Sequence, residues 1–306
     1  MTILIATSVV RGSQQGESHG GVYLVHVNEE KVLQTIDWNT TNIDWQGRGW
    51  DRGLRGIAFD GEYVYIAASD ELFAYDRKFS KLDSFRSPYL KHCHEISRYK
   101  RRLYLTSTAF DALLGFDLDK QRFSWGLHID SEENAFRSTA FDPIGNAGPP
   151  PRNLLHLNAV CAQEQGLYIS GLRTNGLLKF DGKRISKTIS LPHGVHNARP
   201  FRNGVLFNDS QANVVRYEAP AERKSFPVPH YRPEFLTHTD LGDPRIARQA
   251  FGRGLCAISG NLIAAGSSPS TIAIHNLETG DTDMTVTLSY DVRNAIHGLE
   301  VWPFED

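Results

Sequence analysis

The sequence is poor in cysteine, has no surplus of charge of either sign and has no long apolar run. Its 306 residues include three cysteines, an odd number without a CxxC spacing, so neither a disulfide framework nor a thiolate zinc site is expected. With 33 basic and 35 acidic side chains, the net charge of −2 gives no field to attract nucleic acid or an anionic membrane. No apolar run approaches the roughly 18 residues of a spanning helix, and the first residues lack the basic flank of a signal peptide. We therefore expect a cytoplasmic protein with a small-molecule substrate and without nucleic-acid or membrane partners.

An internal repeat runs through the chain. Four twelve-residue segments align without gaps, each with a strand, a polar turn and a second strand: 55–66, 94–105, 158–169 and 196–207. A shortened copy spans 256–265, and a last copy ends after one strand at 297–302. Third and fourth strands follow, with alternating apolar and polar residues and with Gly, Asn and Asp at the turns. Repeats of about 40 residues with this pattern predict the blades of a propeller.

The two ends of the chain complement each other. Residues 3–38 contain only the outer three strands of a blade, and the segment from His297 contains only an innermost strand. We therefore predict one all-β domain over residues 1–306, a six-bladed β-propeller of four-stranded antiparallel blades. In this fold the N- and C-terminal strands complete one blade and hide both sheet edges.

The spacing of the repeats alternates between short and long. Their first positions lie 39, 64, 38, 60 and 41 residues apart. The three long connections, 38–54, 128–155 and 228–254, each join a fourth strand to the next first strand, so they are expected to emerge on one face and roof one end of the channel. Long loops on a rigid scaffold are where function usually lies. The three connections are rich in arginine and aromatic residues: Trp45, Arg48, Trp50, Arg52, Arg137, Phe141, Arg152, Tyr231, Arg232, His238, Arg245, Arg248 and Arg253. This composition favours a small anionic substrate with an apolar part, although loops also use arginine to fasten themselves to a rim.

Histidine opens the first strand of every second blade. The six opening residues are Arg55, His94, Asn158, His196, Cys256 and His297. Three neutral imidazoles with an open fourth position form the ligand set of a catalytic zinc site. We predict one divalent metal ion on His94, His196 and His297, with zinc favoured and iron or manganese as alternatives. The competing interpretation is a channel of hydrogen-bonded histidines around water.

Four residues flank these positions. His92 and His156 each lie two residues before an opening position, on the same side of an extended chain. Each is a candidate fourth ligand, a substrate-binding residue or a structural residue. Glu95 and Asn197 each follow an opening histidine, and they either orient a ligand imidazole of the next blade or form a polar contact between blades.

The other opening positions contribute a cation, an amide and a thiol. Arg55 is a candidate catalytic residue that pairs with a substrate carboxylate or oxyanion, or else it forms a salt bridge to a neighbouring blade. Asn158 is a candidate substrate-binding residue. Cys256 is either a reactive, substrate-facing thiol or a small packing residue. In the long connections, Arg152 is a candidate substrate-binding residue and Tyr231 a candidate general base, because a nearby metal cation lowers the pKa of a phenol.

Two resemblances follow from these residues. About the last half of the chain resembles a family of uncharacterised bacterial propeller proteins with HLNG and PH-type motifs. The segments that carry this resemblance are HLNAV from His156, LPHGVHNARP from Leu191 and RGLCAISGNLIAAG from Arg253. Histidines on alternate blades also look like the zinc site of peptidylglycine amidating lyase, a six-bladed propeller. That resemblance implies metal ligands at His94, His196 and His297 and the lyase's arginine at Arg55.

Three functions compete at this stage. The first is a metal-dependent lyase or hydrolase acting on a small polar or anionic substrate, whose metal polarises an oxygen or activates water. The second is a non-catalytic propeller that binds a partner across its top face. The third, a calcium-dependent lactonase-type propeller, fits less well, because calcium needs oxygen ligands and the opening positions hold no carboxylate.

Overall fold

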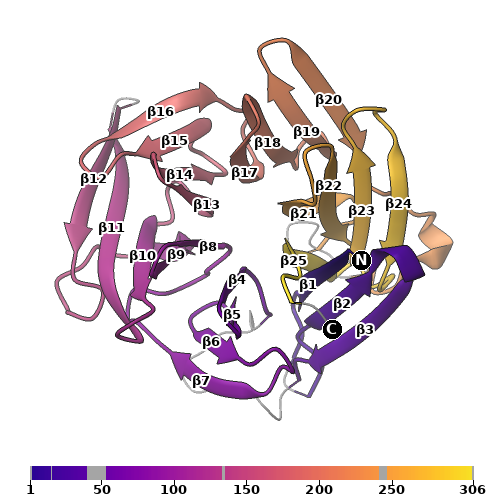
Figure 1. Ribbon diagram of the computed structural model, residues 1–306, viewed down its shortest axis with the longest axis horizontal. Coiled ribbons are helices and arrows are strands. Elements are labelled where there is room, and N and C mark those ends of the chain that lie inside the picture. Colours follow the sequence, from indigo (N-terminus) through magenta and orange to yellow (C-terminus); the bar gives the residue numbers. More distant parts are fainter. Residues whose placement is uncertain (1, 15, 40–52, 133–134, 241–246, 305–306) are drawn as a thin grey trace. The chain divides into compact units, whose positions relative to one another are not determined.

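The computed structural model describes residues 2–14, 16–39, 53–132, 135–240 and 247–304. The chain in these ranges is built almost entirely of strands joined by turns, with a few single-turn 3-10 helices (Figure 1). None of the described helices is long and apolar enough to cross a membrane. The fold is the predicted six-bladed β-propeller, with each blade an antiparallel sheet.

The chain divides into two compact units. A terminal unit contains Met1–Arg55 and Ala212–Asp306, and a central unit contains Gly56–Gln211. The prediction of one domain over residues 1–306 stays a prediction.

The central unit holds three sheets and the first half of a fourth. Their strands are β4 (Ile57–Asp60), β5 (Tyr63–Ala67), β6 (Leu72–Tyr75) and β7 (Lys81–Phe85); β8 (Ile96–Tyr99), β9 (Arg102–Ser107), β10 (Ala112–Asp117), β11 (Arg122–Glu132) and β12 (Ala135–Phe141); β13 (Leu157–Gln163), β14 (Gly166–Gly171), β15 (Gly176–Phe180) and β16 (Ile185–Ser190); and β17 (Val195–Phe201) with β18 (Gly204–Asp209).

The terminal unit holds two sheets and the second half of the sheet β17-β18-β19-β20. Its strands are β25 (Asn294–Val301), β1 (Ile3–Val10), β2 (Gly21–His26) and β3 (Lys31–Asp37); β21 (Phe251–Ala257), β22 (Leu262–Ser268), β23 (Thr271–Asn276) and β24 (Thr282–Thr287); and β19 (Val214–Ala219) with β20 (Glu222–Pro227).

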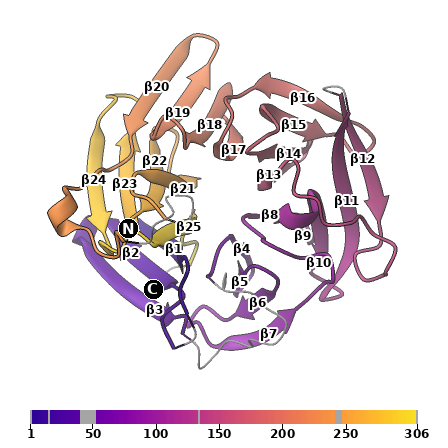
Figure 2. The ribbon, with the colours of Figure 1, turned by 180° about the vertical axis from the view of Figure 1, so that it is seen from behind.

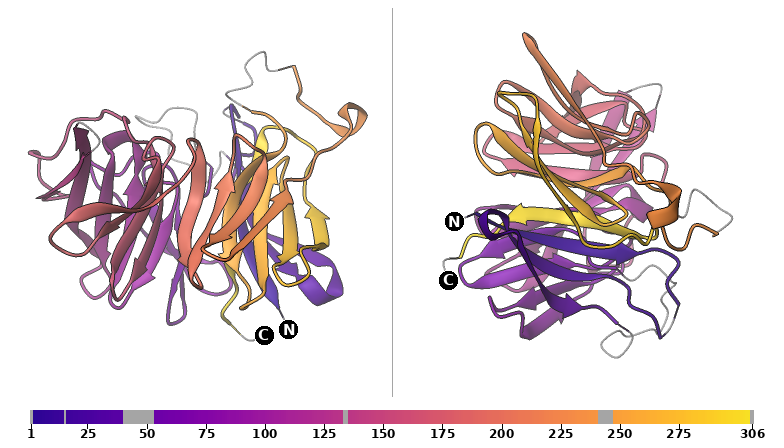
Figure 3. Two further views of the ribbon diagram at one scale, coloured as in Figure 1. Left: turned by 90° about the horizontal axis from the view of Figure 1, so that it is seen from above. Right: turned by 90° about the vertical axis from the view of Figure 1, so that its right-hand side faces the viewer.

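The pairing of the chain ends is confirmed. The last strand β25 is antiparallel to β1, with Leu4 opposite Val301 and Ala6 opposite Leu299 (Figure 3). The order β25-β1-β2-β3 makes β25 the inner strand of this blade, as expected. It begins at Asn294, three residues earlier than the repeat alignment placed it.

The connection 128–155 was expected to be a roof loop, and this prediction is wrong for its first half. Strand β11 continues to Glu132, and β12 returns beside it from Ala135 to Phe141 as a fifth strand (Figure 2). The physical reason is the content of strand-favouring side chains in residues 135–141, where two phenylalanines and a threonine suit an added edge strand.

Apolar clusters between neighbouring sheets hold each unit together. One cluster of the central unit contains Tyr65, Leu105 and Phe116, all fully buried. Each such side chain contributes on the order of 1.5–3 kcal/mol to stability. Gly56 permits the close approach of the first two sheets, since a Cβ there would lie 2.5 Å from the backbone nitrogen of Ile96.

Candidate functional site

Three consecutive inner strands of the central unit carry the predicted imidazoles and amide. His94 lies two residues before β8, Asn158 is the second residue of β13, and His196 is the second residue of β17. All three side chains are buried.

The His94 ring is held in one tautomer. Its Nδ1 lies 2.8 Å from the carbonyl oxygen of His92 and 2.9 Å from Thr108 Oγ1. Because a carbonyl only accepts, Nδ1 carries the proton and Nε2 keeps its lone pair. Thr108 in turn donates to the carbonyl oxygen of Leu157, the residue before Asn158. This arrangement is typical of metal-ligating histidines, whose second nitrogen donates to an oxygen.

His156 lies against His94, with ring centroids 5.4 Å apart and planes at 66°. Its Nδ1 is 3.0 Å from Asn153 Oδ1, so this ring also keeps its Nε2 lone pair. The turn before it is firmly anchored, because the Asp111 carboxylate accepts the backbone N–H groups of residues 154–156 and Arg173 donates to the carbonyl oxygens of 153 and 154. Burial raises the pKa of the Asp111 carboxyl, against the opposing effect of these hydrogen bonds.

Asn158 connects this cluster to the next strand. Its Nδ2 donates to the carbonyl oxygen of Val195 at 2.8 Å. Its Oδ1 is buried and has no hydrogen-bond partner among the described residues. An unpartnered buried amide oxygen costs about 1–3 kcal/mol, which a bound donor would recover. On β17 beside it, His196 Nδ1 lies 2.9 Å from Ser210 Oγ.

Glu95 and Asn197 form the predicted polar contact. Asn197 Nδ2 donates to Glu95 Oε2 at 2.8 Å, and Asn208 Nδ2 donates to Asn197 Oδ1 at 3.0 Å. Arg199 lies at 3.9 Å from the same carboxylate. The two residues thus join the sheet of β8 to the sheet of β17.

His297, in the terminal unit, has a different environment. Its Nε2 lies 3.3 Å from Arg253 Nη1, and because guanidinium only donates, the Nε2 lone pair faces Arg253. His297 also differs from His196 by one position in its strand. His196 is the last residue of β17 that pairs with its neighbour strand before a β-bulge. His297 lies inside the bulge of β25, at the position that Asn197 has in β17. One residue changes the face on which a side chain emerges.

Three guanidinium groups of the terminal unit surround one aromatic ring. The Cζ atoms of Arg253, Arg248 and Arg11 lie 4.6, 4.7 and 5.2 Å from the centroid of Phe251. Burial lowers the pKa of Arg248. Arg248 and Arg253 were predicted from the sequence, whereas Arg11 and Phe251 were not. The position of Arg11, directly after the first strand, was the available indication.

The other candidates are placed as follows. The Arg55 side chain is buried, and its carbonyl oxygen accepts from Thr7 Oγ1. Arg152 is exposed, and its backbone N–H donates to the carbonyl oxygen of Ala109 at 3.0 Å. The prediction that Cys256 opens its strand is wrong, because β21 begins at Phe251 and Cys256 is its sixth residue, fully buried in an apolar cluster.

Tyr231 is tied to the outer strands of its blade. Its hydroxyl lies 2.9 Å from Thr271 Oγ1 and 2.7 Å from Thr287 Oγ1, and its ring makes an edge contact with Tyr290. A role as general base requires that hydroxyl to leave both threonines. Among the other residues predicted for the long connections, five lie outside the described residues: Trp45, Arg48, Trp50, Arg52 and Arg245.

No group of three or more metal-ligating side chains is gathered within the part of the chain that the structure describes. Within the central unit, His94 and His156 each have an Nδ1 that donates to an acceptor, which leaves the Nε2 lone pair unprotonated.

Comparisons with known proteins extend to the fold alone. Neither a known protein family nor a curated protein sequence matches the chain. A chain in the crystal structure of a nidogen/laminin complex is similar at a TM-score of 0.60, with 10% identity and 98% of each chain covered. A protein of unknown function from Bacteroides caccae has a TM-score of 0.58 and 8% identity over 97% of each chain. Virginiamycin B lyase from Staphylococcus aureus, with a TM-score of 0.45, 10% identity and coverage of 80% of this chain and 69% of the lyase, is too distant to bear on function.

Proposed function

We propose that the protein is a metal-dependent enzyme, a lyase or hydrolase, that acts on a small anionic substrate with an apolar part. The observation that carries the substrate class is the convergence of Arg11, Arg248 and Arg253 on Phe251. Guanidinium groups bind carboxylates and other oxyanions through paired, charge-assisted hydrogen bonds, so three of them around one ring favour an anionic substrate. The Phe251 ring among these groups is the apolar contact proposed for the rest of the substrate.

The proposed metal ligands are His94, His196 and His297, which stand near the starts of inner strands in alternate blades. The Nδ1 hydrogen bonds of His94 and His196 support this role. A divalent metal there, with zinc favoured, supplies a Lewis acid that polarises an oxygen or lowers the pKa of bound water. His297 serves through Nε2 only when Arg253 withdraws, and the released guanidinium is then available to the substrate.

The remaining candidates bind or orient substrate in this proposal. Asn158 offers its unpartnered buried Oδ1 to a substrate or water donor. Arg55 is the proposed partner of a developing oxyanion, and His92, His156 and Arg152 are proposed substrate contacts. The burial of Cys256 in an apolar cluster and the hydrogen bonds of the Tyr231 hydroxyl make packing and loop anchoring their better-supported roles.

Metal analysis tests the proposal. The protein is stripped with a chelator, loaded separately with zinc, iron(II) or manganese, and its bound metal is measured by mass spectrometry. We expect one metal per chain and its loss in His94→Ala, His196→Ala and His297→Ala. His193→Ala is the matched control, because His193 is exposed three residues before His196 and should leave metal content unchanged.

The second candidate function is a non-catalytic binding module, favoured by the lack of a gathered three-ligand cluster among the described residues. If the wild-type protein binds none of the three metals, or all three histidine variants keep its metal content, this function replaces the first.

A further inference from the structure

A groove lies in the central unit, between the sheet β8–β12 and the sheet β13–β16, and the proposed function does not use it. It has a volume of about 370 Å³. Four partly buried aromatic rings line it: Tyr99, Tyr104, Trp125 and Phe180. Trp125 stands at 86° to Tyr104 with centroids 5.8 Å apart, and at 38° to Phe180 with centroids 6.3 Å apart. The rings therefore present faces in more than one direction, as the walls of a cage do.

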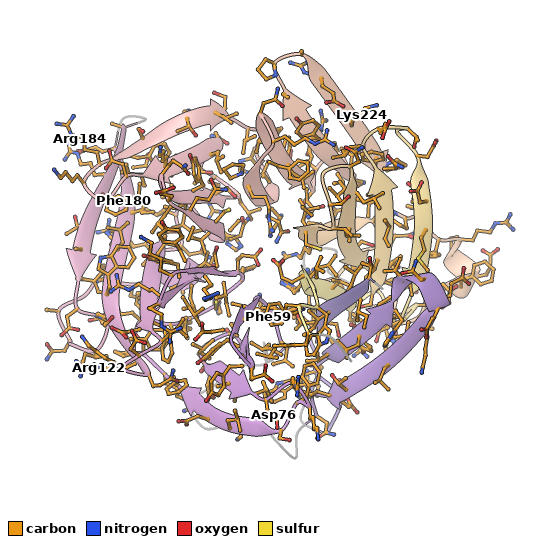
Figure 4. The ribbon with its side chains drawn as sticks, in the orientation of Figure 1. Phe59, Asp76, Arg122, Phe180, Arg184 and Lys224 are labelled. Atoms are coloured by element: carbon orange, nitrogen blue, oxygen red, sulfur yellow. The ribbon has the colours of Figure 1, made fainter. Side chains whose placement is uncertain are left out.

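Carboxylates stand at the edge of these rings. Glu164 is exposed in the turn between β13 and β14. Phe180 is the last residue of β15 (Figure 4), and Asp181 follows it in the sequence. Asp181 Oδ1 accepts the backbone N–H groups of Lys183 and Arg184 at 2.8 Å each, which lowers the pKa of its carboxyl and keeps it ionised.

Arg102 is the one basic side chain among the described residues that line the groove. It is opposite Asp117 in the β9-β10 ladder. Its aliphatic stem lies over Gly115 beside Trp125. Against this one arginine the lining has the two carboxylates of Glu164 and Asp181, so its formal charge is negative.

We propose that this groove binds a small organic cation, an alkylammonium or quaternary ammonium group. A cation with an apolar surface is attracted by the negative faces of aromatic rings, and the carboxylates at the rim favour the same charge. The volume suits a small molecule. An anion is disfavoured by the carboxylates, and a neutral molecule gains nothing from them.

Calorimetric titration with choline, and separately with its uncharged isostere 3,3-dimethylbutan-1-ol, tests the proposal on the full chain. The two probes have nearly the same shape, with carbon in place of nitrogen, so their difference isolates the charge. We expect saturable choline binding in the millimolar range and binding of the isostere about tenfold weaker, the size of a partly desolvated cation–π interaction.

A matched pair of variants locates the binding. Asp181→Asn removes the charge but keeps the Oδ1 acceptor of the turn, and should weaken choline binding several-fold. Asp76→Asn is its control, because Asp76 Oδ1 accepts the backbone N–H groups of Lys78 and Ser80 in the equivalent turn after β6, at 2.9 and 2.8 Å. It should leave choline binding unchanged.

Three results overturn the proposal: no saturable choline binding, equal affinity for the uncharged isostere, or equal losses in the two aspartate variants. Trp125→Leu should abolish choline binding. If this variant does not fold, the comparison of Asp181→Asn with Asp76→Asn decides whether the groove is the binding site.

Discussion

His275 should make the protein sensitive to mild acid. This residue lies on β23, its ring is stacked on Phe226 at 4.5 Å and 18°, and its Nδ1 is 2.9 Å from Thr282 Oγ1. Its Nε2 is buried and has no hydrogen-bond partner among the described residues. Burial lowers the pKa of the imidazole to about 4, from an ordinary value of 6.5.

The direction and size of the effect follow from proton linkage. Between pH 6.5 and 4 the unfolded chain binds a proton at His275 that the folded chain does not, so the free energy of unfolding falls as the pH falls. The stabilisation is fully present above pH 6.5. With these two pKa values, the loss between pH 7.5 and pH 5 is about 2 kcal/mol.

The variant His275→Phe keeps the stacked ring and removes the titrating group. It should lose about 1 kcal/mol at pH 7.5, because the hydrogen bond to Thr282 is gone. Its further loss between pH 7.5 and pH 5, measured by urea unfolding, should be about 2 kcal/mol smaller than that of the wild type. The exposed His193 supplies the control variant His193→Gln, which should follow the wild type. A His275→Phe protein with the wild-type pH dependence would refute the reasoning.

Three further predictions concern the fold. Deletion of residues 294–306 removes β25 and uncovers the edge of β1. We therefore expect the truncated protein to show no cooperative thermal transition by circular dichroism. A truncated protein that melts like the full chain contradicts the closure of the blade by β25 and β1. Asp111→Ala leaves the N–H donors of residues 154–156 without their acceptor and should cost about 3 kcal/mol in urea unfolding, with a smaller loss in Asp111→Asn. Tyr231→Phe removes the hydroxyl that joins two threonines and should cost about 1–2 kcal/mol, whereas unchanged stability would show that this contact does not anchor the loop.

The strands and their pairing were predictable because they depend on local alternation and on a repeat. The segments 55–66 and 196–207, for example, became the hairpins β4-β5 and β17-β18, and the incomplete end copies paired as β25 with β1. The fifth strand β12 was not predictable in the same way, because residues 135–141 lie in a long connection between repeats and do not alternate between apolar and polar side chains.

The candidate site was less predictable, because it depends on bulges and on contacts between distant segments. A bulge displaces every later side chain of its strand by one position, and no repeat alignment reveals it. The last ladder partners before the bulges of β17, β21 and β25 are His196, Gly252 and Ile296. Cys256 therefore lies four positions beyond the equivalent of His196, in the core, and His297 occupies the place of Asn197. The convergence of Arg11 with Arg253 joins residues 242 positions apart in the chain, which no local pattern encodes.

Anion binding by the arginines around Phe251 and metal binding by the imidazoles of the central unit can be tested separately, and anion binding can be tested first. Anion binding by Arg11, Arg248 and Arg253 needs no metal, since guanidinium is always charged. A small aromatic carboxylate should therefore protect the chelator-treated protein against thermal unfolding, and Arg248→Gln should reduce that protection. If His94→Ala abolishes metal binding but retains the protection, the substrate class stands independently of the metal. If the carboxylate binds only the metal-loaded protein, the arginines instead fasten their own loops, and the substrate must be sought through the metal ligands.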